Sequence, residues 1–308
     1  MTKALVVGGN GFIGSHLVDE LVSSSWDVTV LDIVKRRYND LPQGVQFIQG
    51  DFGQNYLLRE ALTGVDVVFH LAWATIHETS NQDLAGDIRA NLIPTVQLLE
   101  ACRFAGTRRV VFISSGGTVY GPPQNIPIHE SHPQKPINAY GVMKLTVEKY
   151  LQMFKHLYGL EYAVLRPSVP YGPRQNPLGR QGAVAVFLYR VAGSQPLTIW
   201  GDGSISRDYF YISDLVSALL ASAEHELGDP PIYNIGGAKQ VSLLELIEKI
   251  EEVVDKKAMI EYQPSRPFDS PHVVLDANKI QSELGWRPKV SLTQGLDLTW
   301  HWMRTTID

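Results

Sequence analysis

Short apolar runs alternate with stretches of helical periodicity through the first half of the chain. The runs are rich in Val, Ile and Leu and occupy residues 4–7, 28–31, 45–48, 65–70 and 110–114. The segments between them, such as residues 14–23 and 90–104, repeat apolar residues at the spacing of a helix. Unbroken apolar runs of this kind are typical of parallel strands that are buried on both faces. The pattern therefore predicts an α/β fold with a doubly wound parallel sheet.

The composition of the chain changes after Arg166. Residues 167–206 are rich in Pro, Gly, Gln and Asn, and we interpret them as mostly loops on the substrate side. Further patterned segments are 142–157 (helix), 162–165 (strand), 183–191 (apolar stretch), 232–235 (strand), 243–254 (helix), a strand near 258–262 and a last helix that ends near Arg304. The chain has no repeat and no linker. We expect a first domain at residues 1–166 and a smaller α/β domain mainly at 167–308, packed closely on the first and returning some segments to it.

Charge and hydropathy exclude several classes of protein. The 308 residues carry 27 Lys and Arg against 32 Asp and Glu, which gives a formal charge of −5 without a basic block. This balance argues against nucleic acid or an anionic membrane surface as the main partner. No apolar run approaches the roughly 18 residues of a spanning helix, and the N-terminus has no signal-peptide pattern. We therefore expect a soluble, cytoplasmic protein.

Cys102 is the only cysteine in the chain. A single thiol rules out an internal disulfide and a multi-cysteine metal site, so we expect no metal, and it fits a reducing compartment. Its surroundings, LLEACRFAG, have an apolar helical pattern. A packed thiol is therefore the expectation, rather than a nucleophile.

Three glycines, Gly8, Gly11 and Gly14, lie in VVGGNGFIG between a predicted strand and a predicted helix. Glycine at these positions permits a tight turn, the close approach of a pyrophosphate and close packing of the helix on the strand. The free amides and the positive end of the helix dipole then bind the anion. A simple tight turn is the alternative, but the strand–turn–helix context favours a dinucleotide site.

Asp32 ends the next strand, 18 residues after Gly14, where a carboxylate would hold the ribose diol of a dinucleotide. A 2′-phosphate would meet this negative charge, so Asp32 favours NAD over NADP. Lys35, Arg36 and Arg37 follow closely and could bind that phosphate instead. We favour a solvated loop face for these three basic residues.

Tyr140 and Lys144 lie four residues apart in YGVMK, so both side chains share one face of a helix. A phenol has an unperturbed pKa of about 10 and is a poor base at neutral pH, but an adjacent ammonium stabilises its phenolate. Such a pair can take a proton from a sugar hydroxyl while hydride leaves to nicotinamide. An incidental surface pair is the alternative; the position of YGVMK after SSGGTVYG, at the end of an apolar run, favours catalysis.

Many separate motifs, in one order, link nearly the whole chain to a known family. They are VVGGNGFIGSHLVDEL, QGDF (49–52), FHLAW (69–73), Asn91 before LLEA, SSGGTVYG, YGVMK, LRPSVPYGP, IWGDGSISRDYFYISD, YNIGG, RPFD and LGWRP. On these motifs the chain resembles the NAD-dependent nucleotide-sugar epimerase/dehydratase branch of the extended short-chain dehydrogenase/reductase family. The resemblance implies a Rossmann domain that binds NAD and a smaller domain that binds a nucleotide sugar.

The resemblance also implies roles for individual residues. Asp51 and Phe52 would flank the adenine, and Ser114 and Pro167 would lie near the nicotinamide. The implied NAD-binding set is Gly8, Gly11, Phe12, Ile13, Asp32, Asp51, Phe52, Leu71, Ala72, Trp73, Asn91, Ser114, Tyr140, Lys144 and Pro167. The implied substrate-binding set is Thr118, Val169, Thr198, Trp200, Arg207, Arg266 and Asp269. Of these, Thr198 and Trp200 would lie by the nucleobase of the substrate.

Arg207 and Arg266 would hold the nucleotide diphosphate. An ion pair with Asp208 or Asp214 is the alternative for Arg207. We favour the ligand, because the two-pronged donor geometry of a guanidinium suits a diphosphate.

Gly116 departs from the family pattern, which has Ser or Thr four residues before the Tyr of the YG pair to hydrogen-bond the reacting sugar oxygen. The nearest hydroxyls belong to Ser115 and Thr118, and a water could also fill the role. We favour Thr118 as the third catalytic member, because two residues further along an extended chain it faces the same way. Gly117 and Thr118 also replace the Asp–Glu pair of 4,6-dehydratases and the Glu of decarboxylating relatives. Both of those reactions are therefore disfavoured.

Two valines mark further departures on the substrate side. Val169 in RPSVPYG replaces an Asn that contacts substrate in the family, which weakens that contact or marks a different substrate. Val273 stands where a larger residue narrows the sugar pocket of epimerases restricted to simple hexoses. A small residue there leaves room for an N-acetyl group or a C6 carboxylate; an ordinary strand residue is the alternative.

The function that these motifs favour is NAD-dependent 4-epimerisation of a UDP-hexose through a transient 4-keto sugar. Tyr140 would be the base, and Lys144 would lower its pKa and hold the nicotinamide ribose. One alternative is a 4-keto reductase that uses NAD(P)H with the same residues. A second is a cofactor-binding sensor without catalysis.

Relatives in this family dimerise through two helices that correspond to residues of about 90–104 and 141–157, which implies a homodimer. Apolar residues that could supply this face are Leu92, Val96, Leu99, Val147 and Leu151. Core packing explains the same residues.

Overall fold

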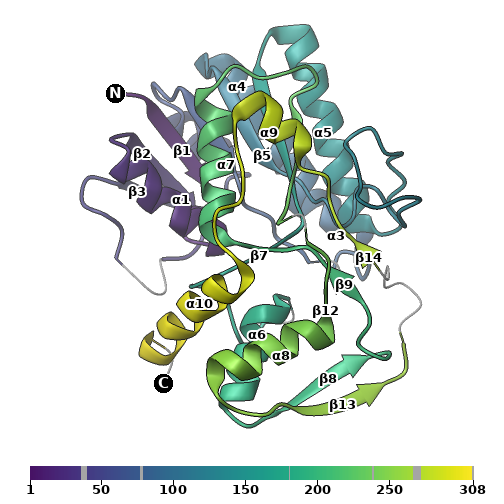
Figure 1. Cartoon of the computed structure of the whole chain (residues 1–308). Coiled ribbons are helices and arrows are strands. Elements are labelled where there is room, and N and C mark those ends of the chain that lie inside the picture. The colour runs from purple at the N-terminus through teal and green to yellow at the C-terminus, as the bar shows by residue number, and fades with distance from the viewer. Residues whose placement is uncertain (36–39, 77–78, 180, 238, 266–271, 307–308) are drawn as a thin grey trace.

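The centre of the protein is a seven-stranded parallel sheet with the strand order β11-β6-β5-β4-β1-β2-β3 (Figure 1). The structure is a computed structural model that describes residues 1–35, 40–76, 79–179, 181–237, 239–265 and 272–306. The strands of this sheet are β1 (Lys3–Val7), β2 (Asp27–Asp32), β3 (Gln46–Gln49), β4 (Val67–His70), β5 (Arg109–Ile113), β6 (Glu161–Pro167) and β11 (Ile232–Ile235). The direction in which the strands are added reverses between β1 and β4, and the carboxyl ends of strands at such a switch point form a ligand crevice.

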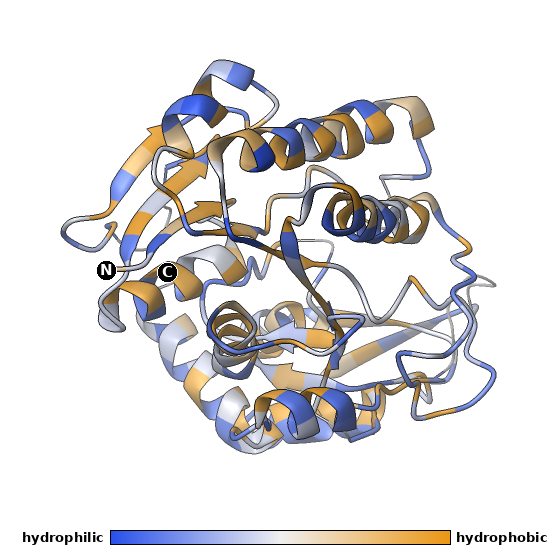
Figure 2. Cartoon of the chain, turned by 90° about the horizontal axis from the view of Figure 1, so that it is seen from above, coloured by the Kyte–Doolittle hydropathy of each residue, from blue (hydrophilic) through white to orange (hydrophobic). Residues whose placement is uncertain are grey.

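Helices cover both faces of the sheet because alternate strand residues point to opposite sides. In β1, Ala4 and Val6 join the apolar cluster under α1, whereas Leu5 and Val7 join the cluster under α2, α4 and α5. These helices and the short segments before α4 are α1 (Phe12–Ser23), α2 (Asn55–Ala61), α3 (Leu84–Asp87), the π-helical turn η1 (Ile88–Leu92), α4 (Ile93–Ala105) and α5 (Ala139–Tyr158). Figure 2 shows the mostly apolar strands between helices that mix polar and apolar residues. The structure confirms the doubly wound sheet.

The cluster under α4 and α5 settles two of the alternatives raised by the sequence. Cys102 is fully buried there, and burial raises its pKa to about 12, so the thiol stays protonated. Leu99, Val147 and Leu151 are at most 1% exposed and belong to the same cluster. Core packing therefore accounts for these three residues, and they are not available to a dimer face.

Helix α7 (Ile212–Glu224) lies beside α1 and packs on β5 and β6, and it is absent from the sequence prediction. Its apolar residues are interleaved with small ones in ISDLVSALLASAE, and eight of its thirteen residues are buried. Apolar and small residues together are typical of a helix that is enclosed on most sides, and no element is predicted for this stretch from the sequence.

The second lobe is built from short strands and helices. The strand pairings are β7 (Val169–Tyr171) with β10 (Tyr209–Tyr211), β8 (Pro196–Trp200) with β13 (Met259–Gln263), and β9 (Ser206–Arg207) between β12 (Val241–Ser242) and β14 (His272–Val273). Its helices are α6 (Ala183–Ala192), α8 (Leu243–Val254) and α10 (Leu292–Thr306), whereas α9 (Asn278–Leu284) returns to the central sheet and contacts β11. The loop-rich interpretation of 167–206 is thus only partly right, since three of these strands and α6 lie within it or overlap it. Strands of two to five residues are too short to show a period.

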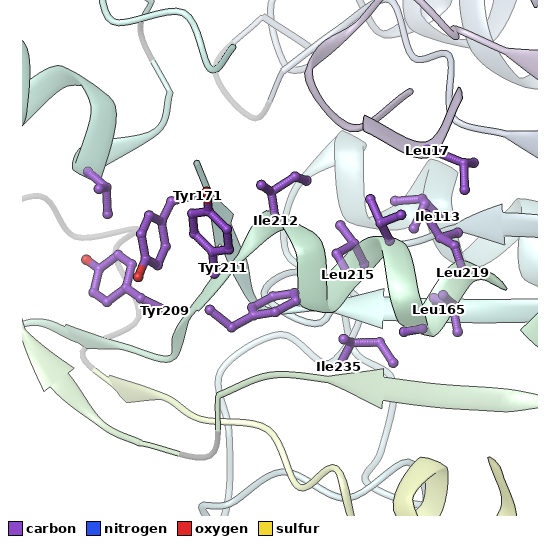
Figure 3. Close-up of a cluster of buried hydrophobic side chains, with 14 of the residues drawn as sticks. Leu17, Ile113, Leu165, Tyr171, Tyr209, Tyr211, Ile212, Leu215, Leu219 and Ile235 are labelled. Atoms are coloured by element: carbon purple, nitrogen blue, oxygen red, sulfur yellow. The ribbon is translucent and has the colours of Figure 1, made fainter. Parts of the chain in front are cut away.

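One apolar cluster joins the two lobes (Figure 3). Tyr171 and Tyr211 pack edge to face at 5.8 Å between ring centroids, at the end of the cluster nearer the second lobe. Leu215 on α7 lies between them and Leu165 and Ile113 of the sheet. The lobes therefore share a core at this junction. No helix in the described residues is long and apolar enough to cross a membrane.

Leu215 offers a test of this shared core, because its side chain is fully buried. Leu215→Ala is expected to lower the free energy of unfolding by about 2–5 kcal/mol, since a cavity is left where α7 meets the sheet. Urea denaturation measures the change. Leu298→Ala on α10 is the matched control: this side chain is 44% exposed, and its change is expected to stay within about 0.5 kcal/mol. Equal losses from the two variants would contradict this packing.

Candidate active site

The glycine turn after β1 is closed by contacts that only glycine permits. Gly8 has a φ of +85°, and Gly11 donates its amide to the carbonyl oxygen of Gly8 at 3.2 Å. A Cβ on Gly14 would lie 2.1 Å from that same oxygen, and a Cβ on Gly8 would lie 2.7 Å from the amide nitrogen of Ala72. The turn is therefore packed against both α1 and the segment after β4. Gly11 caps α1 without a side chain, which leaves first-turn amides for an anion.

Asp32 lies at the end of β2, beside this turn. Its Oδ2 accepts from the amide of Asn10 at 2.9 Å, and its Oδ1 accepts from the amide of Val34 at 3.1 Å. Each oxygen keeps a further lone pair, so the carboxylate can also accept from a ribose diol. The acid and the glycine turn thus come together at the switch point, as the sequence predicts. Arg36 and Arg37 lie outside the described residues.

The segment after β4 forms the opposite side of the crevice. The amides of Leu71 and Ala72 donate to the carbonyl oxygen of Val7 at 2.9 Å, which fixes this segment against β1. Asn91 is fully buried beneath it and accepts from the amide of Ala74 at 2.8 Å, so Asn91 holds the segment in place. The indole Nε1 of Trp73 is buried and has no hydrogen-bond partner in the described part of the chain.

Tyr140 and Lys144 lie on the first two turns of α5, which Asn138 caps by accepting from the amide of Gly141 at 2.8 Å. Lys144 Nζ donates to the carbonyl oxygen of Ile113 at 2.8 Å. It also lies 3.7 Å from the ring centroid of Trp73 and 5.6 Å from that of Tyr140. The ammonium is thus held between the end of β5 and two aromatic rings, on the face that the four-residue spacing predicts.

Burial dominates the acid–base properties of this pair in the ligand-free protein. Burial, with a smaller contribution from Asp87, raises the pKa of Tyr140 to about 12. Burial also lowers the pKa of Lys144, which the charges of Glu148 and Asp87 partly oppose. Burial and Asp87 both disfavour the phenolate, so the phenol of Tyr140 stays protonated in this state. The lowering of the Tyr140 pKa by Lys144 stays a prediction for the protein with its ligands bound.

The structure explains the glycine at position 116. A Cβ on Gly116 would lie 2.3 Å from Leu275 Cδ1 and 2.9 Å from the carbonyl oxygen of Arg166, so the usual Ser or Thr does not fit. Thr118 is 6% exposed, and its Oγ1 is buried without a hydrogen-bond partner among the described residues. Its carbonyl oxygen would lie 2.8 Å from a Cβ on Gly141, so Thr118 packs directly against the first turn of α5.

A buried polar network behind the site escaped the sequence analysis. Ser114 Oγ donates to Glu148 Oε1 at 2.5 Å, and Arg166 binds both oxygens of Glu148 at 3.0 and 2.5 Å. Arg166 also donates to the hydroxyl of Tyr120 at 2.8 Å, which donates to Asn234 Oδ1 at 2.6 Å. This series of hydrogen bonds thus runs from α5 across the strand ends to β11. Its signal was present: Glu148 follows Lys144 at helical spacing, and Arg166 precedes Pro167 in LRPS.

The other residues assigned to NAD surround the same crevice. Phe12 and Ile13 form the first turn of α1; they are partly buried and pack against the main apolar cluster, which joins the two lobes. Asp51 is exposed and accepts from the amide of Gly53 at 2.8 Å, and the ring of Phe52 lies 5.2 Å from that of His70. Pro167 ends β6, and its carbonyl oxygen accepts from the amide of Gly116 at 2.9 Å.

The substrate-side residues lie on the short strands of the second lobe. Arg207 on β9 pairs in register with Val273 on β14, and one of its Nη atoms donates to the carbonyl oxygen of Ser206 at 2.8 Å. Val169 on β7 packs partly on the main cluster, and Thr198 and Trp200 lie on β8. Arg266 and Asp269 lie outside the described residues.

Val273 is 5% exposed and packs with Val119 and Tyr120, as an ordinary strand residue does. Its small size therefore gives no independent indication of a wide sugar pocket. Asp214, one of the alternative partners of Arg207, accepts from the amides of Lys289 and Val290 at 3.0 and 3.2 Å.

The fold and the crevice at its switch point together are those of a dinucleotide-dependent enzyme. A model of the NAD dependent epimerase/dehydratase family matches residues 4–236. The chain belongs to this family, which confirms the resemblance carried by its motifs.

The relatives narrow the comparison. UDP-glucose 4-epimerase of Mycolicibacterium smegmatis is 35% identical over 309 residues and covers 98% of both chains. The crystal structure of UDP-glucose 4-epimerase from Thermotoga maritima with UDP-glucose has a TM-score of 0.94 at 35% identity and covers 100% of both chains. dTDP-4-dehydro-6-deoxyglucose reductase of Escherichia coli is 34% identical over 304 residues and covers 95% of both chains.

Restoring the usual residue at position 116 tests the packing that excludes it. Gly116→Ser is expected to lower the free energy of unfolding by about 1–3 kcal/mol, because the new side chain meets Leu275 and backbone oxygens. Gly117→Ser is the control, since a Cβ there meets nothing within 4 Å, and its change is expected to stay within about 0.5 kcal/mol. Urea denaturation measures both. A stable Gly116→Ser variant would show that the position tolerates the hydroxyl.

Proposed function

We propose that this protein is an NAD-dependent 4-epimerase of UDP-hexoses. The observation that carries the proposal is the convergence of the Tyr140–Lys144 pair, the unpartnered hydroxyl of Thr118 and the glycine turn at one switch point of the sheet. UDP-glucose is the ligand in the Thermotoga maritima structure, which matches the whole chain. The absence of an Asp–Glu pair at Gly117 and Thr118 disfavours dehydration.

The residues of the crevice fit NAD. First-turn amides of α1 would hold the pyrophosphate and Asp32 the adenosine ribose. The buried Nε1 of Trp73, which has no hydrogen-bond partner among the described residues, is a further donor for the cofactor. NAD supplies, when bound, an acceptor for the hydride from C4 and a donor for its return. The first domain, residues 1–166, would bind NAD, and residues 167–308 would mainly bind the nucleotide sugar through Arg207 and its neighbours.

The acid–base work falls to side chains of this chain. Tyr140 takes the proton of the C4 hydroxyl as the C4 hydride leaves, and returns that proton when hydride comes back on the other face of the 4-keto sugar. Lys144 stabilises the phenolate while it exists, and Thr118 Oγ1 hydrogen-bonds the reacting oxygen. Because each proton and hydride is returned, the reaction has no net oxidation.

A nucleotide-sugar 4-keto reductase is the second candidate, because a reductase from Escherichia coli matches the chain almost as closely as the epimerases do. It would use the same residues but consume NAD(P)H from solution. A need for added cofactor in turnover separates it from an epimerase that keeps and reuses its NAD.

We also propose a homodimer in the cytoplasm. Several large apolar side chains remain exposed on α4 and α5 and would be covered in a dimer: Ile93, Phe104, Val142, Met153 and Leu157. The single thiol, Cys102, fits a reducing compartment.

Removing the phenol hydroxyl tests the catalytic pair. Tyr140→Phe is expected to lower kcat by about 100-fold or more, because the proton loses its acceptor, while the Kd for NAD changes less than about twofold. Tyr158→Phe, at the exposed end of the same helix, is the matched control and is expected to keep full turnover. Kinetics and calorimetric titration with NAD provide the two values. Equal kcat in Tyr140→Phe and wild type would contradict the mechanism, and NAD binding without turnover in both would indicate a sensor.

A matched pair of variants tests the role of Thr118. Thr118→Val keeps the shape but removes the hydroxyl, so kcat is expected to fall by about tenfold or more. Thr118→Ser keeps the hydroxyl and is expected to stay within about threefold of wild type. If Thr118→Val turned over as fast as Thr118→Ser, another group would supply the hydrogen bond.

A further inference from the structure

Asp87 is buried near the Tyr140–Lys144 pair, and no motif singles it out. It ends α3 and is 1% exposed. Its Oδ1 accepts from Thr75 Oγ1 at 2.6 Å and from Asn91 Nδ2 at 2.8 Å. Its Oδ2 is buried and has no hydrogen-bond partner in the part of the chain that the structure describes. A buried carboxylate oxygen without a donor is stable only beside a positive charge or with a proton of its own.

In the part of the chain that the structure describes, the buried Lys144 side chain forms no hydrogen bond or ion pair with a charged group. Glu148 and Arg166 neutralise one another through two hydrogen bonds and are both fully buried. Lys144 is also buried, but its ammonium contacts the carbonyl oxygen of Ile113 and aromatic rings. None of these carries a formal charge.

A buried ammonium is expensive without an opposite charge nearby. Asp87 is tied to the surroundings of Lys144 through Asn91, which accepts from the amide of Ala74. The ring centroid of the preceding residue, Trp73, lies 3.7 Å from Lys144 Nζ. The charge of Asp87 also raises the pKa of Lys144, second to that of Glu148.

We propose that Asp87 is the buried counter-charge of Lys144 and a positioning residue for the Tyr140–Lys144 pair. This inference rests on the proposed function, since it concerns the charge state of the same pair. An anionic Asp87 favours the ammonium of Lys144 and disfavours the phenolate of Tyr140. Asp87 therefore favours the charged form of Lys144 in the ligand-free protein, and it opposes ionisation of Tyr140 there.

The same carboxylate also fixes the geometry of the crevice. Asn91, which Asp87 holds through Nδ2, accepts from the amide of Ala74 with its other amide atom, and Thr75 is the next residue along that segment. Asp87 thus ties the segment after β4 to the π-helical turn that follows it. Such turns occur often at functional sites, where they re-aim side chains within a helix.

Titratable and charged groups act on the pair from several of the described elements packed around it. Glu148 lies on α5, and Arg166 on β6 neutralises Glu148. His70 on β4 is fully buried, and burial lowers its pKa to about 3, so it is neutral at working pH. Asp87 at the end of α3 acts on both members of the pair. Glu148 is neutralised by Arg166, so Asp87 is the carboxylate whose charge Asp87→Asn removes from the surroundings of Lys144.

The pKa of Lys144 tests the proposal directly in the full-length, ligand-free protein. Nitrogen-15 NMR of the lysine side chains follows the titration, and Lys144→Met identifies the signal. Asp87→Asn is expected to lower the pKa of Lys144 by about one unit or more, because an opposite charge nearby is lost. Asp83→Asn on the same short helix is the matched control: its side chain is 71% exposed, so solvent screens its charge and the pKa of Lys144 is expected to stay unchanged.

An unchanged pKa of Lys144 in Asp87→Asn, or an equal shift in Asp83→Asn, would overturn the proposal. The titration needs neither cofactor nor turnover, so a protein that fails to epimerise leaves this test intact. Where turnover is measured, Asp87→Asn is expected to move both limbs of the pH profile of kcat to lower pH, because Tyr140 and Lys144 both lose protons more readily. If kcat fell but both limbs of its pH profile stayed at the same pH, the role of Asp87 would be merely structural, and the proposal would be overturned.

A reciprocal measurement covers the case in which Asp87→Asn does not fold. Lys144→Met leaves the Asp87 carboxylate without its counter-charge, so adding Asp87→Asn to this variant is expected to raise the midpoint of its urea denaturation. An equal or lower midpoint in the double variant would contradict the pairing.

Discussion

The burial of one ammonium organises the active site. Lys144 is buried, and its Nζ donates to the carbonyl oxygen of Ile113 at the end of β5. Placing a charge there costs several kcal/mol unless dipoles, aromatic faces and opposite charges surround it. The end of β5 and the ring of Trp73 supply the first two, and the proposed role of Asp87 is to supply the third. Tyr140 precedes Lys144 by one turn of α5, so the contacts that hold Lys144 also hold Tyr140 beside these groups.

The strand ends around Lys144 are held by a second buried pair. Glu148 and Arg166 link α5 to β6, and the hydroxyl of Tyr120 continues this chain to Asn234 on β11. Strand β11 is distant in sequence from the rest of the sheet, yet it is the edge next to β6. The network therefore couples α5 to a segment from the second half of the chain. The tyrosine cluster beside α7 also joins the two lobes, through apolar packing.

Much of the sheet and of the candidate site can be predicted from the sequence, because these parts depend on the spacing of residues that are close along the chain. The runs that become β1, β2 and β5, the glycine turn and the Tyr140–Lys144 face follow from period and residue type alone. What escaped prediction depends on contacts between distant segments. Helix α7 is recognised as part of the first lobe only by its packing beside α1 and on the sheet, and Asp87 gains its significance only when the segment that carries it folds beside α5. The requirement for glycine at position 116 comes from Leu275, a residue more than 150 positions away.

A turnover assay without added nicotinamide tests the central claim most directly. The purified protein is incubated separately with UDP-glucose, UDP-N-acetylglucosamine and UDP-glucuronate, and proton NMR identifies the products. The account predicts that at least one sugar is converted to its 4-epimer, which also shows that NAD is retained and reused. No reaction with any of the three, or with their galacto partners, would contradict the epimerase. Consumption of NADPH with a 4-keto sugar would then identify the reductase.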